Sequence, residues 1–261
     1  MDNGFNLSIP KTLRGVKLHQ WVKFMEVYEK NKDNESSEFL DKKMIEILCE
    51  VSLKDLSLIP IASFDTVLAH LYDVLNTEVD LVNTFKMKGS DGVEVEFGII
   101  PNLDKMTYGE WEDLENYIFD QKNIHRAMAV LYRPLIYQIG GKYRVHPYQG
   151  TDFYADLMKE MPVDIALGAR VFFLSFSEKI RELYNGLYTQ TVSAGAERGQ
   201  GLSQAFGKKW GGYQAIYALA EGDVRRIDEV TKLPLHQCLM FLEFVKEKNE
   251  LENKLIKQSA R

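Results

Sequence analysis

The segment formed by residues 199–209, GQGLSQAFGKK, partly matches a phosphate-binding loop because it combines glycines with lysines. A P-loop has four residues between its first glycine and the Gly-Lys pair, and then a serine or threonine that binds the metal. Here five residues separate Gly201 from Gly207, and Lys209 stands where the hydroxyl is needed. No strand is expected before the segment. The spacing therefore disfavours nucleotide binding.

The same segment has a second interpretation as a contact region. Residues 190–210 are rich in Gly, Ser, Ala and Gln, which predicts a mobile loop. Arg198, Lys208 and Lys209 make the loop locally basic, and Trp210 lies beside them. A loop of this kind can become ordered on a partner protein. These four residues are candidate partner contacts, and a contact with nucleic acid is the alternative left open.

Four carboxylates, Glu110, Glu112, Asp113 and Glu115, lie in the first turns of a predicted helix. Carboxylates are favoured there by the exposed backbone N–H groups and the helix dipole. Acid–base catalysis would need a cleft that separates the pKa values of two such groups. An enzyme with a scattered active site built from Glu110, Asp113 and His125 remains an alternative hypothesis.

Histidine and cysteine patterns give no sign of a metal centre or a nucleophile. None of the five histidines has another three or four residues away, and none has a cysteine in zinc spacing. Cys49 and Cys238 lie in apolar helical patterns, which predicts two buried free thiols. We therefore expect no cofactor, no metal and no catalytic residue.

The composition is that of an ordinary globular protein of 261 residues, 45% apolar and 27% charged. The 32 basic and 38 acidic residues give a net charge of −6, which argues against general duplex-DNA binding. No stretch approaches the roughly 18 apolar residues of a membrane span. Residues 1–10 lack the basic and apolar regions of a secretory signal. We expect no membrane contact.

Helical periodicity dominates the chain. Apolar residues recur at helical spacing, or capping patterns start a helix, in eight main segments. These expected helices are 17–30, 39–51, 63–76, 107–119, 123–131, 162–188, 211–220 and 235–258. The last of them is apolar on most sides in its first half. Its second half is mostly charged, and Leu251 and Leu255 are among its few apolar residues. This change predicts a helix that is buried first and then projects, so both leucines are further candidate partner contacts.

Two segments instead have the pattern of β-hairpins. Residues 80–87 and 93–99 flank a Gly-rich turn, and Val95 and Phe97 alternate with Glu94 and Glu96. Residues 136–139 and 142–147 flank Gly-Gly, a strong signal for a tight turn. The predicted fold class is mainly α with two small β-hairpins, an α+β protein resembling a helical bundle. The predicted domains are residues 1–100 and residues 101–261, the second carrying the second hairpin and the mobile loop 190–210.

The chain contains the segments IPNLDKMTYGEWEDL at 100–114, NIHRAMAVLYRP at 123–134, MPVDIALG at 161–168, and WGGY at 210–213 with GDVRRIDEVTKLP at 222–234. These segments resemble a group of tailed-bacteriophage morphogenesis proteins of the crAss-like kind. Residues 47–58, ILCEVSLKDLSL, are similar to a short helical stretch of phage tail-assembly chaperones.

The resemblance implies a non-enzymatic virion structural or assembly protein that acts through protein–protein contacts. Other phage virion or tail proteins would be its partners, and a homo-oligomer is compatible with the projecting helix. The alternative is a transient tail-assembly chaperone. The implied location is the virion or the host cytoplasm.

Overall fold

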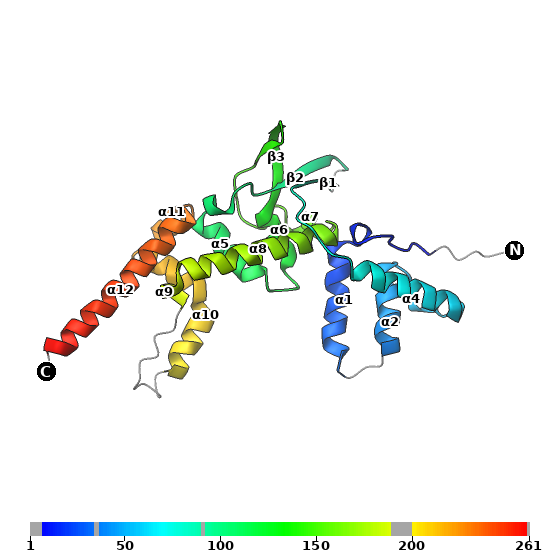
Figure 1. The fold of residues 1–261 in the computed structure, drawn as a ribbon, viewed down its shortest axis with the longest axis horizontal. Coiled ribbons are helices and arrows are strands. Elements are labelled where there is room, and N and C mark those ends of the chain that lie inside the picture. The colour runs from blue at the N-terminus through cyan, green and yellow to red at the C-terminus, as the bar shows by residue number, and fades with distance from the viewer. Residues whose placement is uncertain (1–6, 34–36, 90–91, 189–199, 260–261) are drawn as a thin grey trace. The chain divides into compact units, whose positions relative to one another are not determined.

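A computed structural model describes residues 7–33, 37–89, 92–188 and 200–259, without the side chains of 200–205, 207 and 208. The described part is mainly helical with one small sheet, so the predicted class is confirmed (Figure 1). The chain divides into two compact units. Unit 1 comprises Met1–Pro101 and Asn116–Phe172, and unit 2 comprises Asn102–Glu115 and Phe173–Arg261.

Unit 1 contains a helical group and the sheet. Its helices are η1 (Leu13–Gly15), α1 (Leu18–Asn31), α2 (Ser37–Leu48), α3 (Leu53–Leu56), α4 (Ile61–Leu75), α6 (Ile124–Leu131) and α7 (Ala155–Met158). Its strands are β1 (Thr84–Lys88), β2 (Glu94–Ile99), β3 (Tyr132–Ile139) and β4 (Lys142–Val145). Most of the expected helix ends are reproduced to within two residues.

Unit 2 is helical in its described residues. It contains η2 (Leu103–Lys105), α9 (Asn185–Tyr188), α10 (Gln200–Leu219), η3 (Val224–Arg226), α11 (Ile227–Val230) and α12 (Leu235–Ser259). Two helices, α5 (Tyr108–Tyr117) and α8 (Val163–Leu183), have residues in both units. The expected helix 162–188 is divided into two helices, because α8 ends at Leu183 and α9 begins at Asn185.

The two predicted hairpins join into one four-stranded antiparallel sheet with the order β1-β2-β3-β4. The join is the pairing of β2 with β3, in which Phe97 lies opposite Pro134 and Ile99 opposite Tyr132. Gly140 and Gly141 both have positive φ, as a two-residue turn between β3 and β4 requires. Because β3 pairs with β2, residues 116–172 group with unit 1, whereas the predicted boundary at residue 100 would separate them from it.

Three aromatic residues of the sheet, Phe85, Phe97 and Tyr132, lie in the core. Phe97 and Tyr132 are fully buried, and Phe85 packs against both rings. The Tyr132 hydroxyl donates a 2.6 Å hydrogen bond to the Val82 carbonyl oxygen. That bond holds the segment before β1 against β3.

Unit 2 is organised by a short antiparallel contact between the start of α5 and the start of α12. The Tyr108 amide donates to the Leu233 carbonyl at 2.8 Å, and the Leu235 amide donates to the Met106 carbonyl at 3.0 Å. The helix that was expected to begin at residue 107 starts with a capping box: the Thr107 amide donates to the Glu110 carboxylate at 2.6 Å, and the Glu110 amide donates to the Thr107 hydroxyl at 3.3 Å.

The mobile loop predicted for residues 190–210 is wrong for residues 200–210, which form the first half of α10. Residues 190–199 lie outside the described part of the chain. Each glycine costs a helix about 1 kcal/mol relative to alanine, and the prediction gave that cost too much weight. The residues between the glycines, mostly Leu, Gln, Ala and Lys, are good helix formers, and the helix also packs on α12.

Candidate interaction surface

An aromatic stripe runs along α10 and is formed by Phe206, Trp210, Tyr213 and Tyr217. The spacings of four, three and four residues place these side chains on one face of the helix. Each is between 41% and 60% exposed. Four large aromatic side chains in a row, each about half in solvent, form a surface that a partner could cover.

The other side of α10 faces the interior of unit 2. Leu219 is buried, and Ile216 is half-buried. Gly212 lies against α5, where a Cβ atom would fall 1.6 Å from Oε2 of Glu112. The glycine thus lets the two helices approach closely, and this contact turns the aromatic stripe outward.

Polar groups accompany the aromatic rings of the stripe. The Lys209 ammonium lies 4.9 Å from the centroid of the Trp210 ring, a cation–π contact. The rings of Trp210 and Tyr213 pack at 5.8 Å with an interplanar angle of 48°. Tyrosine and tryptophan suit interfaces because each combines a large apolar ring with a polar edge. The stripe can therefore bind an apolar surface that has polar groups at its margin.

The carboxylate of Glu112 lies against the inner side of this helix at Gly212. Burial raises the pKa of its carboxyl above the ordinary value of 4.5, although a hydrogen bond from the Tyr108 hydroxyl opposes the shift. Glu115 and Asp113 raise the pKa further through their negative charges. Burial also raises the pKa of Tyr108, which therefore stays a hydrogen-bond donor at neutral pH.

We predict that Glu112→Gln stabilises the chain at neutral pH. A raised carboxyl pKa means that the folded state disfavours the ionised form of Glu112. The resulting loss in free energy of unfolding therefore grows as the pH rises from the ordinary carboxyl pKa to the raised pKa of the folded state. Glutamine keeps an oxygen for Tyr108 without the charge. Urea unfolding from pH 3.5 to 8 should show that the variant has a higher free energy of unfolding than the unsubstituted chain, and that this difference disappears at the acid end of the range. Glu182→Gln, at an exposed position of α8, is the control. A gain that is constant across pH would contradict the explanation.

The structure places the sequence-predicted contact residues in three situations. Lys209 and Trp210 lie at the stripe, whereas Leu251 and Leu255 lie exposed on α12. Arg198 and the side chain of Lys208 lie outside the described part of the chain. Sequence reasoning missed Phe206, Tyr213 and Tyr217, although their spacing relative to Trp210 was the signal that could have found them.

The acidic cluster on α5 is divided among separate partners within unit 2. Glu110 binds the start of its own helix, and Glu112 accepts from Tyr108. Glu115 forms an ion pair with Arg181 and accepts a 2.8 Å hydrogen bond from the Ser177 hydroxyl. Among the residues that the structure describes, no group of three or more His, Cys, Asp or Glu side chains could hold a metal ion.

The predicted thiols are both buried and free. Burial raises the pKa of Cys49 and of Cys238 to about 11 in each case. Thiols with such values are protonated at neutral pH and are poor nucleophiles.

Unit 1 contains a small pocket of about 180 Å³ beside α1. Its lining includes His19, Lys23, Lys122, His125 and Lys159. Burial, together with the charges of Lys159 and Arg126, lowers the pKa of His125, so this ring is neutral at pH 7. The histidine of the scattered-site hypothesis thus lines a shallow basic hollow in unit 1.

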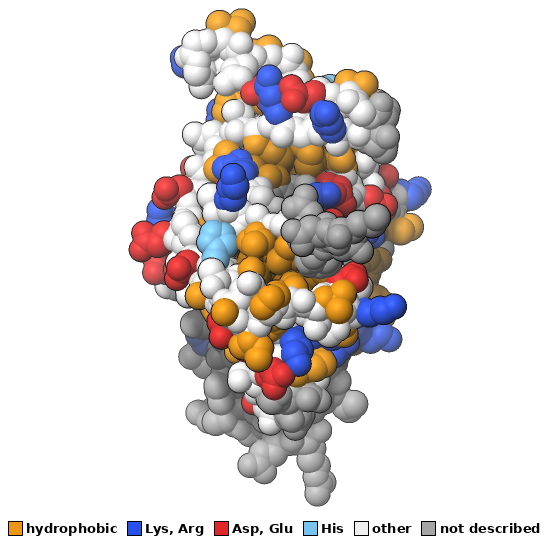
Figure 2. Space-filling view, turned by 90° about the vertical axis from the view of Figure 1, so that its right-hand side faces the viewer, with side chains coloured by type: hydrophobic (Ala, Val, Ile, Leu, Met, Phe, Trp, Pro, Cys, Tyr) orange, Lys and Arg blue, Asp and Glu red, His pale blue; other side chains and the backbone are white. Residues whose placement is uncertain are grey.

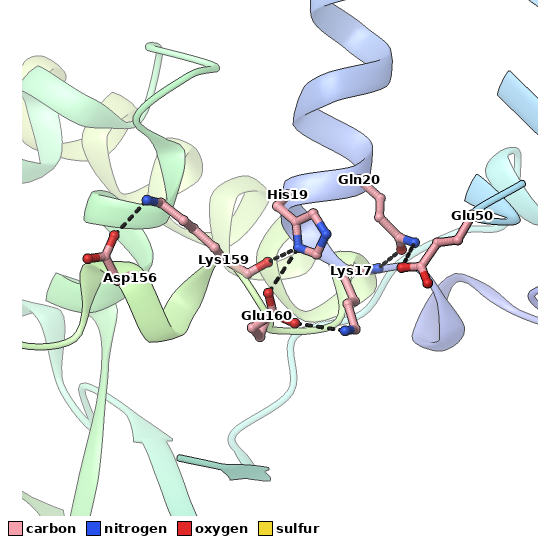
Figure 3. A network of polar contacts seen from close by, with 7 residues as sticks. All are labelled: Lys17, His19, Gln20, Glu50, Asp156, Lys159 and Glu160. Atoms are coloured by element: carbon pink, nitrogen blue, oxygen red, sulfur yellow. Dashed lines mark hydrogen bonds and ion pairs between the residues drawn. The ribbon is translucent and has the colours of Figure 1, made fainter. Parts of the chain in front are cut away.

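A polar network next to this pocket joins the start of α1 to the turn between α7 and α8 (Figure 3). Nζ of Lys17 lies 2.8 Å from Glu160, and this pair raises the pKa of Lys17 and lowers that of Glu160. Nδ1 of His19 lies 3.1 Å from the Lys159 carbonyl oxygen and 3.3 Å from Glu160. On the other side of Lys17, Gln20 donates to Glu50 at 2.9 Å.

Backbone hydrogen bonds accompany this network. The amide of Leu18 donates to Met161 at 2.8 Å, and the amide of Val163 donates to Val16 at 2.8 Å. The side chains of Lys17, His19 and Glu160 thus help these backbone bonds to attach α1 to the turn, which is a structural role.

Exposed hydrophobic side chains occur elsewhere as well. Figure 2 shows one face of the chain, on which they lie in several groups among charged side chains. Such scattered exposure is common on protein surfaces. What distinguishes α10 is the regular spacing of four exposed aromatics. No helix in the described ranges is long and apolar enough to cross a membrane.

Comparison of the chain with protein-family models, with curated proteins and with solved structures finds no match in any of the three.

Proposed function

We propose that the chain is a non-enzymatic assembly protein that acts by binding another protein through the aromatic stripe on α10. The observation that supports the proposal is the stripe itself: Phe206, Trp210, Tyr213 and Tyr217 at helical spacing and about half exposed. Tryptophan and tyrosine are enriched among the residues that contribute most to protein interfaces. Their rings lose little conformational entropy when a partner covers them.

Photo-crosslinking tests this proposal. A benzoylphenylalanine at Tyr213 should form one dominant adduct with another protein in the cells that make the chain. The matched control position is Ala218 of the same helix, which is exposed and lies about 140° around the helix axis from Tyr213. Equal adducts from both positions, or no adduct from Tyr213, would contradict the proposal.

The binding energy should come from the aromatic rings. We predict that Trp210→Ala with Tyr217→Ala lowers the Tyr213 adduct at least tenfold, because truncating one central aromatic residue costs an interface about 1–2 kcal/mol. Both side chains are exposed in the free chain, so its helical circular dichroism should not change. An adduct yield within twofold of the unsubstituted chain would remove the stripe from the interface.

The resemblance to tailed-phage morphogenesis proteins supports a narrower form of the proposal, in which the partners are virion or tail proteins. Mass spectrometry of purified particles tests it. A stoichiometric amount in the particle indicates a structural subunit, and abundance in infected-cell lysate with none in particles indicates a transient tail-assembly chaperone. Absence from both would contradict both forms.

A further inference from the structure

The last helix, α12, has two apolar faces. The inner face contains Leu235, Cys238 and Leu239, which are buried, and the helix packs on α9 and α10. On this side the Glu243 carboxylate lies against Gly186 of α9, and the Lys246 ammonium donates to the carbonyl oxygen of Gly186. These contacts fix which side of α12 faces the rest of unit 2.

The outer face has an apolar stripe of its own. Its members are 45–63% exposed and comprise Met240, Phe241, Phe244, Leu251 and Leu255. At 100° per residue, the centre of this stripe lies nearly opposite the buried residues Leu235, Cys238 and Leu239, and about 135° from the side that carries Glu243 and Lys246. Every residue of α12 from 251 to its end at Ser259 is exposed. The stripe therefore begins over the body of unit 2 and continues along a projecting helix.

The spacing is that of a coiled-coil seam. Phe241, Phe244, Leu251 and Leu255 occupy positions a, d, d and a of a heptad pattern, in which Lys248 fills the remaining central a position. The segment 240–255 is about 24 Å long at 1.5 Å per residue. A lysine at one a position lowers affinity but restricts the register and the oligomeric state.

Charged residues beside the seam indicate that a second copy of this helix fits it, and in which orientation. In this heptad pattern Glu247 and Lys254 take g positions, and Glu252 takes an e position. Two antiparallel copies bring g positions together, so Glu247 of each copy would lie beside Lys254 of the other. Two parallel copies bring g beside e, so Glu247 would face Glu252 of the other copy with like charge. The antiparallel pair therefore gains two attractive Glu247–Lys254 contacts. The parallel pair would instead have two repulsive Glu247–Glu252 contacts, so the charges favour the antiparallel arrangement.

We propose that the outer face of α12 binds the same face of a second copy of this chain in an antiparallel two-stranded coiled coil. The contact is isologous, and the same residues serve both copies. The inference is independent of the α10 stripe, which lies on a different helix.

Sedimentation equilibrium of the full chain over a concentration series tests the pairing. We expect a reversible monomer–dimer equilibrium. Phe244→Asp should abolish the dimer while circular dichroism stays unchanged, because Phe244 is 62% exposed. A chain that is monomeric at every concentration would overturn the inference, while the crosslinks from Tyr213 would still decide the role of α10.

Charge reversal tests the orientation. Glu247→Lys and Lys254→Glu should each weaken the dimer about tenfold, because each creates two like-charge contacts in place of two attractive ones. The double variant, or an equimolar mixture of the two single variants, should restore the original dissociation constant. Lys257→Glu, off the seam on the exposed end of α12, is the matched control. A tighter dimer for Glu247→Lys would indicate parallel helices and overturn the antiparallel assignment.

Discussion

Replacing Gly168 with alanine is expected to destabilise unit 1 by about 3 kcal/mol, because forcing an extra carbon into a closed contact costs this much. Gly168 lies in α8 where the helix touches the segment before β1. A Cβ at this position would fall 2.2 Å from the carbonyl oxygen of Asp80 and 2.9 Å from its carbonyl carbon. Both atoms belong to the backbone, so no side-chain rotation can relieve the clash.

The surrounding contacts oppose a shift of the segment. The Val82 carbonyl accepts the hydrogen bond of the buried Tyr132 hydroxyl, and the Asn83 carbonyl accepts a 2.9 Å bond from the Ile99 amide. Moving Asp80 by the more than 1 Å that a Cβ needs would strain both bonds. We therefore expect the cost to appear as lost stability.

A second helical glycine provides the control. Gly211 of α10 has no atom within 4 Å of the position that a Cβ would take. Gly211→Ala should therefore stabilise the chain by about 0.5–1 kcal/mol through reduced backbone entropy of the unfolded state. Urea unfolding measures both variants, with hydrogen exchange of the β2 amides reporting on Gly168→Ala in unit 1 and that of the α10 amides reporting on Gly211→Ala in unit 2. A loss below 0.5 kcal/mol for Gly168→Ala would show that the segment yields easily.

Local patterns predicted the elements whose causes are local. The capping box at Thr107 and Glu110 depends on two residues three apart, and the turn at Gly140 and Gly141 depends on positive φ at both. Sequence alone contains these causes, so the start of α5 and the turn of the second hairpin were correctly predicted.

Features that depend on distant contacts were not predictable in the same way. Nothing in either hairpin indicates that β2 pairs with β3. Ile99 and its β3 partner Tyr132 are separated by 32 residues, and this intervening segment is mainly helical. The helix α10 that contains residues 200–210 is also supported from a distance, because its second half packs into unit 2 through Ile216 and Leu219. The candidate site was missed for this reason: a segment taken as a loop was given no helical face, so the aromatic stripe could not be recognised.

The join between the hairpins leads to the second large effect. Phe97→Ala is expected to destabilise unit 1 by about 3–5 kcal/mol, the usual cost of removing a buried phenylalanine side chain. Phe97 is fully buried on β2; its ring stacks on Phe85 at 5.7 Å and meets Tyr154 edge-on at 5.8 Å. In the sheet register Phe97 lies between Phe85 of β1 and Pro134 of β3.

This position makes the substitution a test of whether the two hairpins form one cooperative sheet. Hydrogen exchange of Phe97→Ala should show similar losses of protection in β1 and in β3, because the cavity lies where both strands pair with β2. Val95→Ala on the same face, where the side chain is only half-buried, should cost about 1 kcal/mol. Loss of protection confined to β1 would mean that β3 and β4 are held by the helices rather than by β2, and that the hairpins open separately.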